Sequence, residues 1–326
     1  NKFLTIGLIL SYTSTVLLFQ ILKTKIMIKK ILIGLVSISV LAFITLYFSS
    51  RPNLEEDGSY SPSSLALILG TVSKTDFEEI KYTKYQGDKS KVLVIFTEQK
   101  NLEMKNGKSF STGNHPVEAL VPMLHLKNAG FDFEIATPTG KPVVFEMWAF
   151  PEQDEQVKAI YNEYKSSFEH PKKLTEFITN SFANDSSYAA VFIPGGHGAM
   201  IGIPDDRNVG KVLNWAHQND LFTITLCHGP GALLSTTLDN QKFLYDGYKM
   251  AVFPDAIDEM TPLIGYLPGH MILGVSERLK NLGAIIVNTE SDNTVCVDRK
   301  LITGASPLAS NELGKLAANT LLKELH

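Results

Sequence analysis

The stretch that decides the fold is Phe222-Thr-Ile-Thr-Leu-Cys227-His228-Gly229-Pro230-Gly231-Ala232, an apolar run followed by a turn and a helix-compatible run. A strand that breaks sharply into a helix projects the residue at the turn from the sheet, a geometry known as a nucleophile elbow. Cys227 is therefore expected at the carboxyl end of a strand, where open α/β sheets bind ligands. The start of the next helix would favour a thiolate and lower the pKa of Cys227. The alternative is a buried, inert cysteine, since free cysteines are among the most buried residues.

Around this stretch, strand-like and helix-like segments alternate. Continuous apolar runs, typical of strands buried on both faces, occur at 92–97, 131–137, 189–194, 222–226, 248–253 and 284–288. Apolar residues at helical spacing occur at 116–128, 205–219 and 307–325. This alternation predicts an α/β fold with a doubly wound, mainly parallel sheet covered by helices on both faces. Residues 145–185 interrupt the rhythm and are predicted to form a small helical cap insert.

The first 50 residues have a different character. Two apolar runs, 3–22 and 31–48, flank a basic stretch with four lysines at 23–30, and each run is long enough to span a membrane. Three interpretations compete: a signal-anchor helix starting at Met27, a two-helix hairpin with a basic cytoplasmic loop, and a cleaved secretory signal. No small-x-small cleavage site follows the second run, which argues against the third. The first two predict one or two N-terminal transmembrane helices.

The lysines also predict the side of the membrane, because basic flanks stay in the cytoplasm. The protein is then membrane-anchored with an extracytoplasmic catalytic domain, or cytoplasmic if the N-terminal segment is a gene-model artefact. On the interpretation that begins at Met27, residues 1–26 alone are an over-extended gene model. The predicted organisation is a membrane segment at 1–50, a linker and N-terminal arm at 51–90, and a catalytic domain at 91–326.

Composition narrows the functional classes. The net charge is -4, and the body has no clustered Lys and Arg, so we expect no nucleic-acid partner. Two cysteines, Cys227 and Cys296, are too few for a disulfide scaffold. The sequence has no Gly-x-Gly-x-x-Gly fingerprint and no P-loop, so no nucleotide cofactor is expected.

Three further patterns suggest partners for Cys227. Gly195 and Gly196 follow an apolar run, and their backbone N–H groups could hold an oxyanion, although a plain turn would look the same. Glu118 falls in the first turn of a helix that begins near Pro116, where it could shuttle a proton or merely favour the helix N-terminus. Asp255 or Asp258 could orient His228, and the residues themselves do not choose between the two.

Six motifs resemble the ThiJ/PfpI superfamily, and within it the glyoxalase III and HchA-type chaperone branch. They are STGNHPVE at 111–118, FEMWAFP at 145–151, PGGHGA at 194–199, LCHGP at 226–230, GYLPGH at 265–270 and DRKLITGASP at 298–307. The likeness runs from about 92 to 325. It implies a flavodoxin-like sheet of the class I glutamine amidotransferase type, a homodimer, and cofactor-free conversion of methylglyoxal or glyoxal to lactate or glycolate without glutathione. Protein deglycase and chaperone activities are also associated with the branch.

The resemblance implies a role for each matching residue. Cys227 matches the nucleophile, which would form a hemithioacetal with a small 2-oxoaldehyde, and His228 matches its neighbouring histidine. Asp258 matches the third triad member, and Glu118 matches the acid that contacts the thiol. Gly196 and the backbone N–H of His228 match the oxyanion site.

The branch can also bind a metal through two histidines and a carboxylate. The matching positions here are Lys127, Asp132 and Tyr164. Neither histidine is present and Lys127 would repel a cation, so we expect no metal.

Two rival functions remain at this stage. A cysteine peptidase or amidase could use the same triad types, and a membrane-tethered holding chaperone without turnover would need only exposed apolar patches. His115, His197 and His270 lie in the family motifs, where structural roles are at least as well supported as roles in shaping the pocket. Cys296 lies in a strand-like run and is expected in the core.

Overall fold

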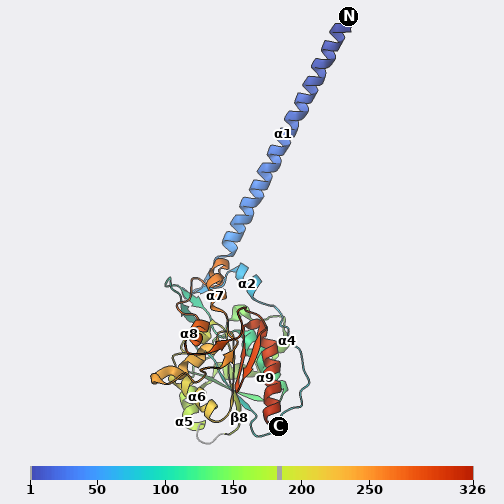
Figure 1. Ribbon diagram of the computed structural model, residues 1–326. Helices are drawn as coiled ribbons and strands as arrows, with labels where there is room; N and C mark the ends of the chain where they lie inside the picture. Colours follow the sequence, from blue (N-terminus) through green and yellow to red (C-terminus); the bar gives the residue numbers. More distant parts are fainter. Residues whose placement is uncertain (1, 182–185, 326) are drawn as a thin grey trace. The chain divides into compact units, whose positions relative to one another are not determined.

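The computed structural model describes residues 2–181 and 186–325, in two units divided between Ser50 and Arg51 (Figure 1). The first unit is one continuous helix, α1 (Lys2–Ser49). Its segment Phe19–Ser49 is long and apolar enough to cross a membrane, a criterion that an N-terminal signal sequence also meets. The two-helix hairpin is wrong for this structure, because α1 runs through the four lysines without a turn. That stretch contains neither Gly nor Pro to break a helix.

The second unit is built on a central sheet whose described strands follow the order β12-β13-β9-β8-β3-β6-β7. All neighbouring pairs are parallel except β12 with β13, which is antiparallel at one edge. The predicted doubly wound, mainly parallel sheet is therefore confirmed. The strands are β3 (Lys91–Ile95), β6 (Asp132–Thr137), β7 (Lys172–Lys173), β8 (Tyr188–Ile193), β9 (Phe222–Leu226), β12 (Val295–Asp298) and β13 (Leu301–Gly304).

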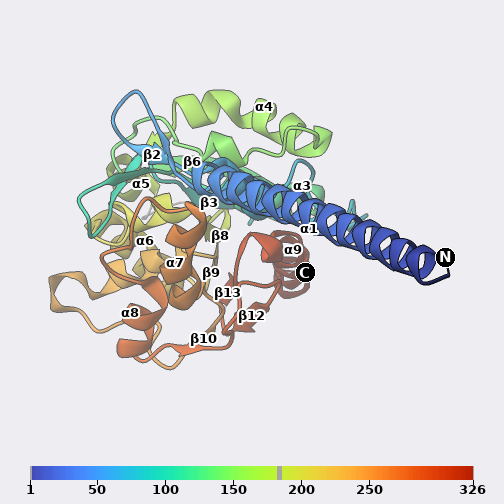
Figure 2. The ribbon, with the colours of Figure 1, turned by 90° about the horizontal axis from the view of Figure 1, so that it is seen from above.

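Helices cover both faces of this sheet (Figure 2). Successive residues of β3 alternate between two apolar cores, Val92 and Val94 in one and Leu93 and Ile95 in the other, because strand side chains point to opposite faces. The first core is completed by α3 (Pro116–Asn128), α4 (Glu155–Glu169) and α9 (Ser310–Leu325). The second is completed by α5 (Leu174–Ser181), α6 (Arg207–Gln218), α8 (Val275–Asn281) and the 3₁₀ segment η3 (Gly229–Asn240).

The predicted cap insert is helical over most of its length. It contains the short 3₁₀ helix η1 (Met147–Ala149), then α4, β7 and α5, and β7 joins the edge of the central sheet. Asp154 caps α4 by accepting hydrogen bonds from the N–H groups of Gln156 and Val157, both 3.1 Å long. Residues 182–185 of the predicted insert lie outside the described residues.

A small sheet combines strands from before and after β3, and a short helix lies between its second strand and β3 in the chain. The small sheet has the order β1-β2-β5-β4, from β1 (Asn53–Leu54), β2 (Tyr60–Ser61), β4 (Asn101–Glu103) and β5 (Ser109–Ser111). Helix α2 (Ser64–Gly70) is capped by Ser63, whose hydroxyl accepts from the N–H of Ala66 (3.0 Å) and donates to the carbonyl of Ile264 (2.6 Å). The arm is thereby fixed to the 3₁₀ turn η4 (Thr261–Ile264).

Two of the predicted strands differ from the structure. Of 248–253 and 284–288, only β10 (Lys249–Met250) and β11 (Ile285–Ile286) are strands, and they pair with each other rather than with the central sheet. Beyond β10, side chains rather than a neighbouring strand accept the backbone hydrogen bonds. Thr303 Oγ1 accepts from the N–H of Ala251 (2.8 Å), and Asn288 Oδ1 accepts from the N–H of Val252 (3.0 Å). The remaining elements are η2 (His197–Met200), α7 (Asp255–Met260) and η5 (Pro307–Ala309).

The topology places a ligand site at one edge of the sheet. From β3 the chain adds β6 and β7 on one side, and then crosses to add β8, β9 and β13 on the other. Open α/β sheets bind ligands beyond the carboxyl ends of the strands at such a switch point. Cys227 follows β9, and the glycine pair 195–196 follows β8 after a single proline.

Candidate active site

Cys227 forms the sharp turn after β9. Its backbone is left-handed, with φ of +58°, a conformation that costs energy for a residue with a side chain. Two hydrogen bonds hold the turn: the N–H of Cys227 donates to the carbonyl of Gly304 (2.8 Å), and its own carbonyl accepts from the N–H of Phe253 (2.9 Å). The strand therefore stops at Leu226, and the side chain of Cys227 projects from the sheet edge.

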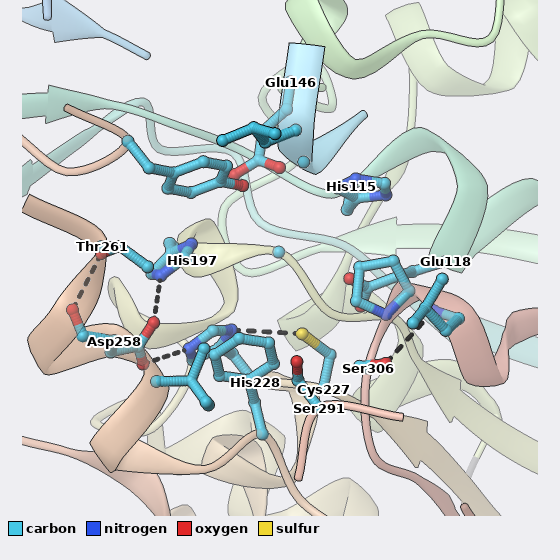
Figure 3. Close-up of a pocket in the computed structure, with 18 of the residues that line it drawn as sticks. His115, Glu118, Glu146, His197, Cys227, His228, Asp258, Thr261, Ser291 and Ser306 are labelled. Carbon is cyan, nitrogen blue, oxygen red and sulfur yellow. Dashed lines mark hydrogen bonds and ion pairs between the residues drawn. The ribbon is translucent and has the colours of Figure 1, made fainter. Parts of the chain in front are cut away.

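The thiol opens onto a cavity of about 260 Å³, although only 3% of the residue is exposed. Figure 3 shows the polar groups of this cavity. The alternative of a cysteine sealed in a dry core is therefore wrong. The lining residues are Leu69, Gly70, His115, Glu118, Glu146, Gly196, His197, Cys227, His228, Phe253, Ile257, Asp258, Thr261, Ile264, Tyr266, Ser291, Ser306, Pro307 and Leu308.

A chain of hydrogen bonds links Cys227, His228 and Asp258. Cys227 Sγ lies 3.3 Å from His228 Nδ1, and His228 Nε2 lies 2.8 Å from Asp258 Oδ2 (Figure 3). The other aspartate that the sequence left open does not reach the imidazole, because Asp255 accepts from the N–H groups of Ser276 (3.0 Å) and Glu277 (2.7 Å). The structure thus places Asp258, and not Asp255, beside His228.

Asp258 also binds a second histidine. His197 Nε2 lies 3.0 Å from Asp258 Oδ1, and the rings of His197 and His228 lie 4.1 Å apart between centroids. Burial opposes ionisation of Asp258, but the two histidines outweigh it and hold the pKa of this carboxyl well below its usual range. Sequence reasoning gave His197 no particular partner, and its only signal was its place in the PGGHGA motif.

Glu118 lies against the thiol. It is 1% exposed, and its carboxyl faces Cys227 and the N–H of Gly196 without a hydrogen bond of normal length to any described residue. Burial raises the pKa of Glu118 well above its usual value. Burial also raises the pKa of the Cys227 thiol, and a negative charge on Glu118 raises it further. A thiolate here therefore requires that Glu118 keep its proton.

This result corrects the expected low pKa of Cys227. The following segment begins as a tight 3₁₀ turn at Gly229, and the buried position and the neighbouring acid determine the direction of the shift. The positive end of a regular helix, on which the expectation rested, is not what Cys227 faces.

The two glycines occupy different places. Gly196 lines the cavity with φ of +94°, a conformation that favours glycine. Gly195 packs behind it, where an added Cβ would lie 2.0 Å from Glu118 Oε2 and 2.8 Å from Cys227 Cβ. Only Gly196 therefore presents its backbone to a bound molecule, while Gly195 leaves room for the acid and the thiol to approach each other.

Several residues of the cavity wall had no assigned role. Glu146 is 1% exposed and Oε1 accepts from the Thr112 hydroxyl (2.5 Å), while its Oε2 has no partner among the described residues. Burial raises the pKa of Glu146 and lowers that of His115 to about 3, so His115 is neutral near pH 7. Leu69 and Gly70 come from the N-terminal arm. The motifs around 115 and 146 were the only signals for these residues.

The positions that match the branch's metal site do lie together, but as a hydrogen-bonded cluster. Lys127 Nζ pairs with Glu163 and lies 3.4 Å from the Tyr164 hydroxyl, which donates to Asp132. An ammonium and a phenol in place of two imidazoles do not fit a divalent cation. His197, His228 and Asp258 also have their ligand atoms within 4.8 Å of one another. There, however, Nε2 of each histidine is already hydrogen-bonded to a separate oxygen of Asp258.

The other singled-out side chains lie outside this arrangement. His270 is about half exposed and pairs with Glu259 at 2.7 Å. Trp148 packs against Phe110 and Tyr266. Cys296 is half-buried in the edge strand β12 rather than in the core, and both cysteines are free thiols.

Comparison with known proteins identifies relatives of this chain. The sequence profile of the DJ-1/PfpI family matches residues 109–319. Two curated relatives, called protein/nucleic acid deglycase HchA, come from Staphylococcus aureus strains RF122 and MSSA476; they are 48% and 47% identical over 276 residues, which is 84% of this chain and 94% of each relative.

Solved structures share the fold. Glyoxalase III from Candida albicans superposes with a TM-score of 0.56 at 22% identity, covering 71% of this chain and 98% of that one. A structure described as APC35852 gives a TM-score of 0.58 at 23% identity, covering 73% and 99%.

The name of the staphylococcal relatives conflicts with the expectation that nucleic acid is no partner. The lack of clustered basic residues argues against a groove-binding footprint, but a pocket enzyme can act on a modified base without one. That exclusion is therefore withdrawn. With the profile match over most of the body and close relatives along nearly their whole length, the chain belongs to the DJ-1/PfpI family, in its HchA-type branch.

Proposed function

We propose that the protein is a glutathione-independent, cysteine-dependent glyoxalase that converts methylglyoxal to lactate and glyoxal to glycolate. The observation that carries this proposal is that Cys227 Sγ opens onto a cavity between His228, at 3.3 Å, and the buried acid Glu118. The match to HchA relatives and the fold shared with a glyoxalase III support the same chemistry.

In the proposed reaction the Cys227 thiolate adds to the aldehyde carbon of the 2-oxoaldehyde. The new C–S bond gives a hemithioacetal, and the backbone N–H groups of Gly196 and His228 stabilise its oxygen; one such donor is typically worth about 2.7–4 kcal/mol. His228 or Glu118 moves a proton from the first carbon to the second through an enediol, a step for which a placed base supplies about 10²–10⁴-fold. The resulting thioester is hydrolysed by water. The sum is one water added and an internal oxidation and reduction, so no external oxidant is needed.

Asp258 serves this reaction by positioning His228. Its hydrogen bond to Nε2 leaves Nδ1 facing the sulfur, so that the imidazole can take and return a proton there. Glu118, which keeps its proton because burial raises its pKa, stabilises the thiolate as a hydrogen-bond donor.

The experiment is lactate formation from methylglyoxal in the absence of glutathione, by the full chain in detergent and by its Cys227→Ala variant. Cys296→Ala is the matched control, because Cys296 is the other free thiol. We expect turnover by the parent and the control and none by Cys227→Ala. Equal turnover by the parent and Cys227→Ala would refute the mechanism.

Deglycation is a second candidate, supported by the name of the 48% identical relatives. The same thiol would bond to the former aldehyde carbon of an early adduct while the bond from that carbon to the amine or thiol breaks; the released group takes a proton, and the hemithioacetal left on Cys227 then follows the reaction above. Recovery of a free amino group from a freshly glycated peptide, compared between the parent and Cys227→Ala, tests this reaction. An adduct that persists equally with both would exclude it.

The proposal also places the catalytic body at a membrane. Helix α1 supports an anchor, because Phe19–Ser49 is long and apolar enough to cross a membrane. Its lysines favour a cytoplasmic N-terminal side and an extracytoplasmic body. Fractionation with protease protection tests both points, and a body found in the soluble fraction would refute the anchor. The homodimer implied by the family stays a prediction, for which sedimentation analysis is the test.

A further inference from the structure

The wall of the cavity carries a second polar cluster that the proposed reaction does not use. It consists of Glu146 and His115, which Figure 3 shows apart from the row formed by Cys227, His228 and Asp258. Both line the cavity, and each keeps a buried polar atom, Glu146 Oε2 and His115 Nδ1, without a partner among the described residues. Buried polar groups are nearly always paired, so two free ones in a single cavity call for a ligand.

Glu146 is held rigidly in this position. Its N–H donates to the carbonyl of Asn114 at 3.0 Å, and the Thr112 hydroxyl fixes Oε1. The N–H groups of His197 and Gly113 lie near enough to lower the pKa of this carboxyl, but Oε2 has no partner of normal hydrogen-bond geometry among the described residues. A bound molecule that offers a hydroxyl or N–H at this place would gain a hydrogen bond that the protein has already oriented.

The charges around the cavity restrict that molecule further. Three carboxyl groups line it, those of Glu118, Glu146 and Asp258, and none of its described lining residues is Lys or Arg. The histidines offer no counter-charge that is free for a ligand, because His115 is neutral and the other two each pair with an oxygen of Asp258. A negatively charged group on the tail of the bound molecule would therefore be buried without a counter-charge.

We infer that Glu146 and His115 form a subsite for the far end of the substrate, and that this subsite selects 2-oxoaldehydes with an uncharged, hydroxylated tail over those with an anionic tail. The inference extends the proposed glyoxalase reaction, since the tail binds at the subsite while the aldehyde reaches Cys227. It gives Glu146 the role of a specificity-determining residue.

The test measures occupancy of the pocket without requiring turnover. Cys227 is alkylated with iodoacetamide in the full chain, and its protection by each aldehyde is followed by mass spectrometry, with Cys296 as internal reference. The probes are 3-deoxyglucosone, whose tail carries hydroxyl groups, 4,5-dioxovalerate, whose tail ends in a carboxylate, and methylglyoxal, which has no tail. We expect 3-deoxyglucosone to protect at concentrations at least about tenfold lower than 4,5-dioxovalerate, the value of one well-formed hydrogen bond.

Variants assign this preference to the subsite. Glu146→Gln keeps the size of the side chain and removes its charge, and it is expected to narrow the preference by about tenfold. The matched control is Glu152→Gln, the same change at an exposed glutamate that does not line the cavity. Thr112→Val, which removes the hydroxyl that orients Glu146, is a second variant and should narrow the preference in the same direction.

Two results would overturn the inference: equal protection of the parent by the two tailed aldehydes, or an unchanged preference in both Glu146→Gln and Thr112→Val. Methylglyoxal turnover is measured on the same preparations. If turnover is absent but the protection pattern holds, the proposed glyoxalase function fails and the subsite stands. If turnover is present but the pattern is flat, only the subsite fails.

Discussion

Replacing Gly195 with alanine should disrupt the site although no catalytic side chain is itself replaced. The new Cβ would lie 2.0 Å from Glu118 Oε2, 2.6 Å from the carbonyl oxygen of Leu226 and 2.8 Å from Cys227 Cβ. Ordinary contact begins near 3.4 Å, and two of these three neighbours belong to the backbone or lie next to it. The end of β9 and the turn at Cys227 must therefore move by roughly 1 Å, a displacement that can cost about 10²-fold in rate.

The expected stability change is separate and smaller in consequence. Overpacking of this kind typically costs about 1–3 kcal/mol of unfolding free energy, and the body should remain folded. Thermal unfolding followed by circular dichroism gives this cost, and kcat/KM for methylglyoxal gives the loss of activity. The rate of Cys227 alkylation by iodoacetamide reports directly on the displaced thiol.

Gly107→Ala is the control for the stability loss. Gly107 has φ of +74° with nothing within 4 Å of an added Cβ, so alanine there should cost about 1–2 kcal/mol of strain and leave the cavity unchanged. We expect similar unfolding curves for the two variants and a loss of activity in Gly195→Ala alone. If Gly195→Ala has the kcat/KM of the parent, Glu118 and Cys227 are not packed against this glycine as described.

Three further outcomes are expected. Asp258→Asn leaves one of two histidines without an acceptor and should lower kcat by about 10²–10⁴-fold; an unchanged kcat would contradict the triad. Because burial lowers the pKa of His115 to about 3, the folded state resists its protonation and loses stability as the pH falls from about 6.5 toward 3. His115→Gln should flatten this decline in urea titrations, and an identical decline would refute the assignment. The double variant Lys127→His/Tyr164→His, with Asp132, should bind Zn²⁺ in calorimetry where the parent does not; no binding would refute the positional match.

The sequence was most informative where apolar runs are buried on both faces. The predicted strand 222–226 matches β9 residue for residue, and the predicted helix 116–128 matches α3, which begins with Pro116. Runs of that kind have few alternatives in an α/β protein, because only a central strand buries every residue.

The sheet edge was harder to predict. β13 was not recognised as a strand, and β12 was indicated only by the strand-like run around Cys296, because each strand is only four residues long and β12 is partly exposed. They form a hairpin whose turn at Arg299 has φ of +55°, a conformation that sequence patterns for turns assign to Gly, Asn or Asp. The strand-like run 248–253 failed for the opposite reason: its composition suits a strand, but the side chains of Thr303 and Asn288 take its backbone hydrogen bonds.

For the site, the motifs found residues but not their geometry. They singled out Cys227, His228 and Glu118, the resemblance favoured Asp258 over Asp255, and the fold shows Asp258 Oδ2 2.8 Å from His228 Nε2. The two-histidine arrangement on Asp258 joins residues 61 and 30 positions apart, and no local pattern reports such a contact. The direction of the thiol pKa was also beyond the sequence, since it depends on burial against Glu118.

The N-terminal arm has a consequence for how the protein can be cut. Leu69 and Gly70 of the arm form part of the pocket wall. The Tyr82 hydroxyl, also in the arm, lies 2.9 Å from His125 Nδ1, so the arm contacts the rest of the body at both places. A recombinant fragment that starts at residue 91 would keep the nucleophile and its partners, but the cavity would lose the wall formed by Leu69 and Gly70 and become more exposed to water. A fragment that starts at Arg51 keeps this wall of the cavity.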